Sequence, residues 1–402
     1  MELLPNSLWQ AVDETLRPWL VSLHLSIAWT LVIEVFPAVR RPAGLLGLTV
    51  AFLPIFLWVA GPTWFVINLL AYGTASFLVH SASTPSVRWN RACTLMVGAV
   101  LLFTVAHRVW AGGIRIPFNG RMLNWNSFDM FLLLRWVVLL WESGSGKVRT
   151  LAPSRFLIWT VLPVTCFGPF FRYSQFLAQW DRMTRPDETC GPNGTAWWRQ
   201  FLPVGAMLAG LFCIHYAAGL LPHGSHNRAA FLLNTFLFGP WGSLLLIGAI
   251  LRSQEILGQR MGLVLPPSFV RPFGRTNLSD FWANWNMSVT GVFRDLLFYN
   301  RWGRKKANPY VNSIILFTLV GLWHNPNAYW LLWGFLHGCA FAGFLGWRKY
   351  RDQICPIDLR SRIPRRDLWS AALTYTIVCA MWAIPSVLLK FLGNSGTTGT
   401  TP

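Results

Sequence analysis

The chain has 402 residues, of which 53% are hydrophobic and only 12% are charged. A soluble domain carries roughly 25% charged residues, so this chain has too little polar surface to cover a water-exposed globule of its size. The net charge of +19 does not indicate nucleic-acid binding, because the basic residues lie in short stretches between apolar runs and not on a soluble module. The composition therefore predicts an integral membrane protein.

Long apolar runs recur along the whole chain. A bilayer core of about 30 Å is crossed by about 20 apolar residues in a helix, and on this criterion we expect about ten to twelve membrane segments. The runs are Trp19–Phe36, Ala43–Ala60, Pro62–Val79, Thr94–Trp110, Phe128–Trp141, Phe156–Phe171, Phe201–Leu221, Ala229–Leu251, Val311–Leu322, Ala328–Trp347 and Leu368–Leu392. Several are short or interrupted by Pro and Gly, so we expect some helices to be broken or re-entrant.

These segments predict an all-α, polytopic bundle of transmembrane helices around a central cavity. We expect one membrane domain over residues 1–402, with N-terminal helices at 1–150 and a motif-bearing core at 151–347. A basic loop, a last helix and a flexible tail follow at 348–402. The first 16 residues are mixed polar and acidic without a basic start, so no cleavable signal peptide is expected.

The basic residues cluster in short loops between the apolar runs, as the positive-inside rule requires. Examples are Arg40, Arg41, Arg88, Arg91, Lys147, Arg149, Arg155 and the run from Arg348 to Arg366. This pattern predicts a multi-pass protein of the inner membrane with these loops on the cytoplasmic side. The topology is self-consistent only where residues 281–300 cross or deeply enter the membrane.

Seven cysteines occur singly along the chain, with no CxxC and no Cys/His spacing suited to zinc. Most are interpreted as small packing residues. The sequence therefore predicts no metal site and no bound cofactor.

The first polar segment within apolar sequence runs from Gly168 to Phe176. Gly168 and Pro169 are expected to end a helix and to deliver Arg172 and Tyr173 to the membrane interface. One interpretation is a loop that holds a phosphate or a polar headgroup. Interfacial anchoring by the two side chains is the favoured interpretation.

The second polar segment runs from Asp280 to Asp295. Ser279 or Asp280 is a suitable residue to cap a helix here. Helical spacing then puts Trp282 and Asn286 on one face, so that Asn286 is the polar member of an aromatic stripe. Its amide is suited to donate a hydrogen bond to a carbonyl or to orient a reacting group. The alternative is a hydrogen bond between neighbouring helices.

Two charged residues end the second segment. Arg294 and Asp295 are adjacent in the sequence, so they are expected to point to different sides and need not pair with each other.

The third polar segment is Gly-Leu-Trp-His-Asn-Pro at residues 321–326. Pro326 disfavours helix at Asn325, so His324 is expected at a helix break where its ring can reach a cavity. An imidazole with an ordinary pKa near 6.5 is suited to accept a proton from a hydroxyl nucleophile. A histidine hydrogen-bonded to a neighbouring helix is an equal alternative. His337, further along, is interpreted as structural or supporting.

Together the three segments resemble one family, the membrane-bound O-acyltransferases, and within it the bacterial branch of alginate O-acetyltransferase and the teichoic-acid D-alanyl transferase. The branch motifs are Gly-Pro-x-x-Arg-Tyr-x-x-Phe, Phe-Trp-x-x-Trp-His-x-Ser followed by Phe-Arg-Asp, and Gly-x-Trp-His-Gly followed by Leu-Trp-Gly-x-x-His-Gly. They match residues 168–176, 281–295 and 321–338 in order. Two positions depart from the pattern: Asn286 stands at the first histidine, and Asn325 follows the second in place of glycine.

The resemblance implies transfer of an acyl group, acetyl in the first instance, from a thioester to a hydroxyl of a cell-envelope polysaccharide. The donor is an acyl-CoA or an acyl carrier protein. His324 is the implied general base, and Asn286 helps to position the thioester carbonyl or the acceptor. The other residues expected at the substrates are Trp282, Trp285, Arg294, Asp295, Trp323, His337, Arg172 and Tyr173.

Two other function classes stay open. One is a lipid acyltransferase of the same family, which Asn286 favours because lipid-modifying members often have Asn there. The other is a non-catalytic transporter or scaffold, although a transporter is expected to show paired charges within its spans. The expected partners are the lipid bilayer, the acyl donor, a hydroxyl acceptor and an extracytoplasmic acetyl-transfer protein, with no nucleic acid. Arg301, Lys305 and Lys306 either attract an acidic donor or, as favoured, set the topology.

Overall fold

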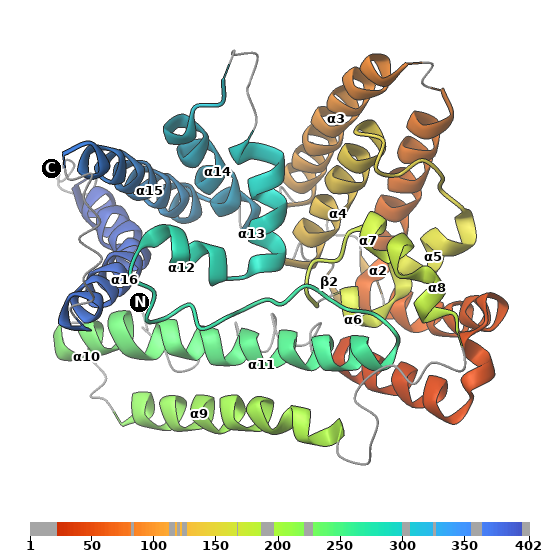
Figure 1. Ribbon diagram of the computed structural model, residues 1–402, viewed down its shortest axis with the longest axis horizontal. Coiled ribbons are helices and arrows are strands. Elements are labelled where there is room, and N and C mark those ends of the chain that lie inside the picture. Colours follow the sequence, from red (N-terminus) through yellow and green to blue (C-terminus); the bar gives the residue numbers. More distant parts are fainter. Residues whose placement is uncertain are drawn as a thin grey trace, which may run out of the picture. The chain divides into compact units, whose positions relative to one another are not determined.

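The computed structural model describes residues 22–81, 84–111, 117–118, 121–122, 127–166, 168–185, 197–220, 228–299, 306–324, 327–354 and 364–395. Nearly all of these residues lie in helices (Figure 1). The one β pairing within the described ranges joins β1 (Pro117–Phe118) to β2 (Arg121–Met122), antiparallel. The predictions about the first 16 residues, Arg301, Lys305, Asn325 and the flexible tail lie outside the described residues.

Several described helices are suited to a bilayer. Those long and apolar enough to cross one are Trp64–Ser81, Arg199–Gly219, Asn234–Arg260, Ala328–Arg351 and Asp367–Leu389. Shorter apolar helices are Ser22–Val35, Pro42–Ile55 and Pro309–His324. The predicted class, an all-α multi-pass membrane protein, is confirmed. The number of about ten to twelve segments and the central cavity remain predictions.

The described residues form two compact units. The N-terminal unit comprises Glu2–Ala206 with Ala249–Pro266, and the C-terminal unit comprises Met207–Gly248 with Pro267–Pro402. The prediction of a single membrane domain remains a prediction.

In the N-terminal unit, two predicted segments form one helix. Its elements are the helix Ser22–Val35, η1 (Pro37–Arg40), α2 (Pro42–Ser81), α3 (Pro85–Ala111), α4 (Ser127–Gly144), α5 (Pro153–Val161), α6 (Pro163–Cys166), α7 (Tyr173–Ala178), α8 (Trp180–Met183) and η2 (Trp197–Phe201). The sequence suggests a break at Gly61-Pro62, but α2 continues through it. Membrane helices tolerate such residues when neighbouring groups satisfy the freed backbone.

The predicted segment Phe156–Phe171 is broken, and its first break lies at Leu162, before the helix end expected at Gly168-Pro169. Pro163 has no N–H to continue the ladder, and the chain forms the short helices α5 and α6 on either side of Leu162. Trp159 links α5 to the chain after α6, because its indole N–H donates a hydrogen bond to the carbonyl oxygen of Phe171 at 3.1 Å. The buried guanidinium of Arg135 lies 4.0 Å over the Trp159 ring and donates to the Trp159 carbonyl at 2.9 Å.

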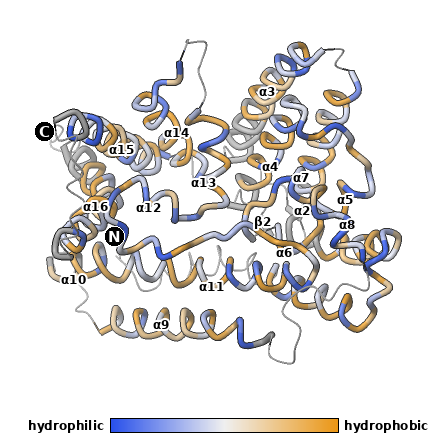
Figure 2. Tube along the Cα trace, in the orientation of Figure 1, coloured by the Kyte–Doolittle hydropathy of each residue, from blue (hydrophilic) through white to orange (hydrophobic). Residues whose placement is uncertain are grey.

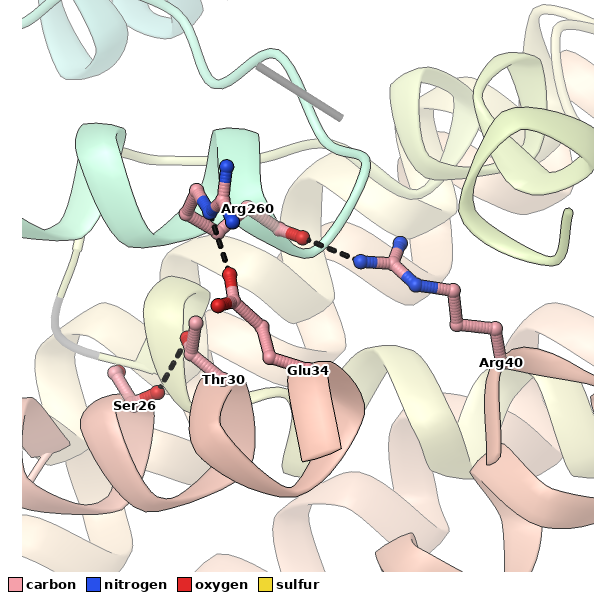
Figure 3. A network of polar contacts seen from close by, with 5 residues as sticks. All are labelled: Ser26, Thr30, Glu34, Arg40 and Arg260. Atoms are coloured by element: carbon pink, nitrogen blue, oxygen red, sulfur yellow. Dashed lines mark hydrogen bonds and ion pairs between the residues drawn. The ribbon is translucent and has the colours of Figure 1, made fainter. Parts of the chain in front are cut away.

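Polar side chains line one side of the helix Ser22–Val35. Ser26 donates to the side-chain oxygen of Gln254 at 2.7 Å. Glu34 pairs with Nε of Arg260 at 2.5 Å, and Arg40 donates to the carbonyl oxygen of Arg260 at 2.8 Å (Figure 3). Because an unpaired polar group is costly away from water, these bonds hold this helix against the C-terminal half of α11 (Gly239–Arg260).

The C-terminal unit carries the two motif segments that follow residue 267. Its other elements are the rest of α9 (Leu202–Gly219), α10 (Arg228–Leu233), the π-helix η3 (Asn234–Phe238), α12 (Leu278–Asn284), α13 (Met287–Phe293), the π-helix η4 (Arg294–Phe298), α14 (Pro309–His324), α15 (Ala328–Ile354) and α16 (Pro364–Ser395). Hydrophobic residues run along α9 (Figure 2), and Leu208, Phe212 and Tyr216 on it are exposed. A helix of this kind is suited to face lipid.

Candidate functional site

Helix α12 begins at a cap that differs from the prediction. The side chain of Asn277 accepts a hydrogen bond from the backbone N–H of Asp280 at 2.9 Å and donates to the Asp280 carboxylate at 2.8 Å. Asn277 is therefore the N-cap, and the prediction of Ser279 or Asp280 is wrong by two or three residues. The reason is that the first orphan N–H groups of the helix lie within reach of the Asn277 amide.

Asn286 lies at a break between two helices. Its backbone is left-handed, with φ 42° and ψ 53°, and Trp285 before it is extended. The prediction that Trp282 and Asn286 share one face of a continuous helix is therefore wrong, because this turn reorients the chain. Asparagine adopts the left-handed conformation more readily than most residues, which gives Asn286 a backbone role besides any chemical one. Its side-chain oxygen lies 3.5 Å from the hydroxyl of Ser288.

The two tryptophans of this segment point into different surroundings. Trp282 is buried and packs edge-on against Phe317 of α14 at 4.9 Å and His337 of α15 at 5.4 Å. Trp285 instead stacks on Phe281 at 5.5 Å and meets Phe269 at 5.1 Å. Trp282 thus joins α12 to the histidine-bearing helices.

Helices α14 and α15 meet backbone to backbone. A Cβ atom at Gly321 would lie 2.1 Å from the carbonyl oxygen of Trp330, and one at Gly334 would lie 2.2 Å from the carbonyl oxygen of Phe317. A Cβ at Gly338 would lie 2.6 Å from the Cα of Ile314. Membrane helices use small residues for such close approach. The glycines of the third motif therefore bring the two helices together.

His324 is the last residue of α14, so the predicted helix end is confirmed. Its side chain is exposed and surrounded by indoles. The imidazole stacks on Trp330 with ring centroids 4.6 Å and planes 23° apart, and it meets the edge of Trp333 at 5.8 Å. Trp323 lies 5.0 Å from it and reaches Phe293 of α13 at 5.7 Å. The ring is therefore both oriented and accessible.

His337 lies one turn after Trp333 on α15 and is 3% exposed. Its Nδ1 lies 2.8 Å from the carbonyl oxygen of Trp333, and the two rings are 4.2 Å apart. Since a carbonyl only accepts, Nδ1 carries the proton. His337 belongs to the same aromatic cluster as His324, with Trp333 in contact with both rings.

Arg294 and Asp295 form an ion pair, so the expectation that their side chains point to different sides is wrong. They open the π-helix η4, and Nε of Arg294 lies 3.5 Å from a carboxylate oxygen of Asp295. The Arg294 side chain is 53% exposed, so this ion pair adds little stability.

Arg172 and Tyr173 lie in the N-terminal unit. Tyr173 is 1% exposed and packs against Trp159 at 5.3 Å, so it is not an exposed interfacial anchor, because the aromatic core encloses it. Arg172 caps α7, and its guanidinium lies 5.5 Å over Trp141. The two are therefore held by different parts of the unit.

The carboxylate of Glu142, on α4, binds the residue that follows Tyr173. It is fully buried and accepts hydrogen bonds from both the backbone N–H, at 3.1 Å, and the hydroxyl of Ser174. Burial raises the pKa of Glu142, while the bonds from Ser174 and the charges of Arg172 and Lys147 oppose that rise. Sequence reasoning missed this contact, because Glu142 follows an apolar run without any motif.

This chain is similar in sequence to several known bacterial acyltransferases. No family model matches the chain. It is 26% identical to the teichoic acid D-alanyltransferase of Bacillus subtilis over 243 residues, 56% of this chain and 60% of that relative. It is 33% identical to a probable alginate O-acetylase of Pseudomonas putida over 88 residues, and 30% identical to the peptidoglycan O-acetyltransferase of Helicobacter pylori over 88 residues. Each 88-residue match covers 21% of this chain, and 18% and 17% of the respective relatives.

The chain is related to the membrane-bound O-acyltransferases. The recognition of this family from the three motifs is thereby confirmed, over about half of the chain. The chain spans 60% of the length of the Bacillus subtilis relative and less than a fifth of the two others.

The family's histidine motif accounts for part of the cluster, and the structure adds Trp330. This residue stacks on His324 but was not among the predicted site residues. The spacing of Trp330, Trp333 and His337, at i, i+3 and i+7, was the available signal, because it places all three on one face of a helix. Within the described residues, no group of three or more His, Cys, Asp or Glu side chains is placed to hold a metal ion.

Proposed function

We propose that this protein is an O-acyltransferase that moves an acyl group, acetyl in the first instance, from a thioester donor to a hydroxyl of a cell-envelope polymer. The printed names of the relatives describe transfer to teichoic acid, alginate and peptidoglycan, all of them such polymers. The observation that carries the proposal is His324: an exposed imidazole, oriented by Trp330, at the histidine of the family's motif.

His324 acts as the general base in this proposal. Its ring takes the proton from the acceptor hydroxyl as the oxygen attacks the thioester carbonyl. The tetrahedral intermediate then expels the thiolate, which receives the proton back from the imidazolium. The products are the ester and the free thiol. General-base assistance of this kind contributes typically about 10²–10⁴-fold to a rate.

Asn286 supports the reaction from the turn between α12 and α13. Its amide is suited to hydrogen-bond the thioester carbonyl, where negative charge develops in the transition state. The other residues proposed to contact the substrates from the same unit are Trp282, Trp285, Trp323, Arg294, Asp295 and His337. For Arg172 and Tyr173, in the N-terminal unit, a substrate contact remains a proposal drawn from the motif alone.

The donor and the setting complete the proposal. We propose an acyl-CoA or an acyl carrier protein as donor, and the inner membrane as location. Arg301, Lys305 and Lys306 are basic residues suited to attract an acidic donor. Of these three, the structure describes Lys306, which is exposed. An extracytoplasmic partner that carries the acetyl group onward is the further proposed partner.

Asn286 favours one alternative, a lipid acceptor, and a single assay distinguishes the two. Membranes containing the protein receive radiolabelled acetyl-CoA with alginate oligosaccharide, peptidoglycan fragments or lysophosphatidylcholine. The proposal predicts label in a glycan acceptor. Label in lysophosphatidylcholine alone would establish the lipid alternative, and label in no acceptor would support a non-catalytic transporter or scaffold.

A further inference from the structure

Three buried polar atoms of the α14–α15 contact have no hydrogen-bond partner among the described residues. They are Nε2 of His337, Nε1 of Trp333 and the hydroxyl oxygen of Thr318. His337 and Trp333 are 3% and 1% exposed. Buried polar groups in proteins nearly always have a partner, and leaving one unpaired is costly. Three such atoms around one helix contact therefore indicate a bound partner there, which is either water or a ligand.

The chemistry of that ligand follows from the tautomer of His337. Its Nδ1 faces the Trp333 carbonyl oxygen at 2.8 Å and must carry the ring proton, since a carbonyl donates nothing. The Nε2 atom of the neutral ring is therefore a bare acceptor. The indole nitrogen of Trp333 is only a donor. A ligand that satisfies both must donate one hydrogen bond and accept another.

A hydroxyl group has this pair of properties. We propose that His337 and Trp333 hold a second hydroxyl of the glycan acceptor, beside the one that reacts at His324. This second hydroxyl donates to Nε2 of the His337 imidazole and accepts from the indole N–H of Trp333. The two rings that supply these atoms lie 4.2 Å apart. A water molecule can also donate one hydrogen bond and accept another, so water is the other candidate for this position. The inference rests on the proposed function, because it assigns the acceptor of that reaction to these two residues.

The same indole relates this hydroxyl to the proposed base. The ring centroid of Trp333 lies 5.8 Å from that of His324 and 4.2 Å from that of His337. Trp282 belongs to the same cluster, because its ring centroid lies 6.2 Å from that of Trp333 and 5.4 Å from that of His337. His337 and Trp333 are accordingly positioning residues for the acceptor, while His324 performs the proton transfer.

Two substitutions at one position separate this role from a structural one. In His337→Asn the amide nitrogen takes the place of Nδ1, so the bond to the Trp333 carbonyl is retained and the acceptor at Nε2 is lost. In His337→Gln the longer side chain brings an amide oxygen to the place of Nε2, which restores the acceptor. The variant Trp333→Phe keeps an aromatic ring and removes only the indole donor.

The kinetic test uses radiolabelled acetyl-CoA with whichever of alginate oligosaccharide and peptidoglycan fragments the wild-type protein acylates. We expect His337→Asn and Trp333→Phe to raise the KM for the glycan about threefold to tenfold, the worth of one neutral hydrogen bond. The KM for acetyl-CoA should stay unchanged, and His337→Gln should lie closer to wild type. Wild-type kinetics in His337→Asn together with impaired His337→Gln would overturn the inference, because the bond to Trp333 would then suffice.

A binding measurement keeps this result separate from the fate of the proposed function. The Tm of the detergent-solubilised protein is measured with and without each glycan. The inference predicts that a glycan raises the Tm of the wild type and of His337→Gln more than that of His337→Asn. This pattern without any acyl transfer would refute the proposed reaction and keep the hydroxyl site. Equal Tm shifts in all variants, or none in any, would show that only water occupies the site, and would overturn the assignment to the acceptor.

Discussion

The imidazole of His324 stacks on the indole of Trp330, with ring centroids 4.6 Å apart and 23° between the planes. The first residue ends α14 and the second lies in the first turn of α15, so the stack joins the two helices beside their connection. It fixes the ring of the proposed base without occupying either of its nitrogens.

The stack predicts a graded effect of substitutions at Trp330. Trp330→Phe should retain most of the acyl-transfer rate, because a stacked ring remains. Trp330→Ala should lower kcat about threefold to tenfold, in line with the worth of an aromatic pair. Both rates are measured at equal protein levels in membranes. Identical rates in wild type and Trp330→Ala would remove the orienting role of the indole.

The close approach of α14 and α15 predicts that Gly334 does not tolerate a methyl group. Gly334→Ala would place a Cβ 2.2 Å from the Phe317 carbonyl oxygen and should destabilise the protein by about 1–3 kcal/mol. Gly343, on the same helix, has no atom within 4 Å of an added Cβ and provides the matched control. Thermal unfolding in detergent measures both. Equal Tm values for the two variants would contradict the backbone contact.

The left-handed turn at Asn286 allows its backbone role to be separated from its amide. Asn286→Gly keeps the conformation accessible and should leave the Tm near that of wild type. Asn286→Ala should lose about 1 kcal/mol, because a Cβ without a local hydrogen bond disfavours φ 42°.

Activity in the Asn286 variants then decides the role of the amide. If it contacts the thioester, the stable Gly variant should still transfer acetyl more slowly than wild type. A Gly variant with full activity would reduce Asn286 to a turn residue.

Glu142 predicts a pH dependence of stability with a defined sign. Its pKa is raised by burial above the ordinary carboxyl value of 4.5, so the folded state binds this proton more tightly than the unfolded state. Its contribution to stability is therefore largest below pH 4.5 and is lost as the pH rises through the raised pKa.

The comparison that checks this is the Tm of wild type minus that of Glu142→Gln, followed across the acid and neutral range. The difference should fall with rising pH. Two parallel curves would show that the ionisation of Glu142 does not affect folding.

The sequence predicted the class, the family and the end of α14, because each depends on a strong local signal. Hydropathy reports the membrane directly, and Pro326 limits the helix that carries His324. The sequence did not predict the turn at Asn286, since helical periodicity assumes a continuous helix. Nor did it predict that α2 continues through Gly61-Pro62, because the breaker residues there are tolerated by their surroundings.

The same limit applies to contacts between distant segments. Tyr173 was expected at an interface and is buried among Phe156, Trp159 and Phe176. Local sequence does not show which side chains come together in a core. The contact of Glu142 with Ser174 joins residues 32 apart and has no local pattern. Trp330 is different: its spacing to Trp333 and His337 was visible in the sequence.

The acetyl-transfer rate of His324→Ala tests most directly whether His324 is the general base. The control is His80→Ala, which alters another exposed histidine at the end of α2. Initial rates are measured with radiolabelled acetyl-CoA and the glycan acceptor in membranes of equal protein content. We expect a loss of about 10²–10⁴-fold in His324→Ala, with a normal Tm, and no loss in the control. A His324→Ala protein that transfers acetyl at the wild-type rate would contradict this role as general base.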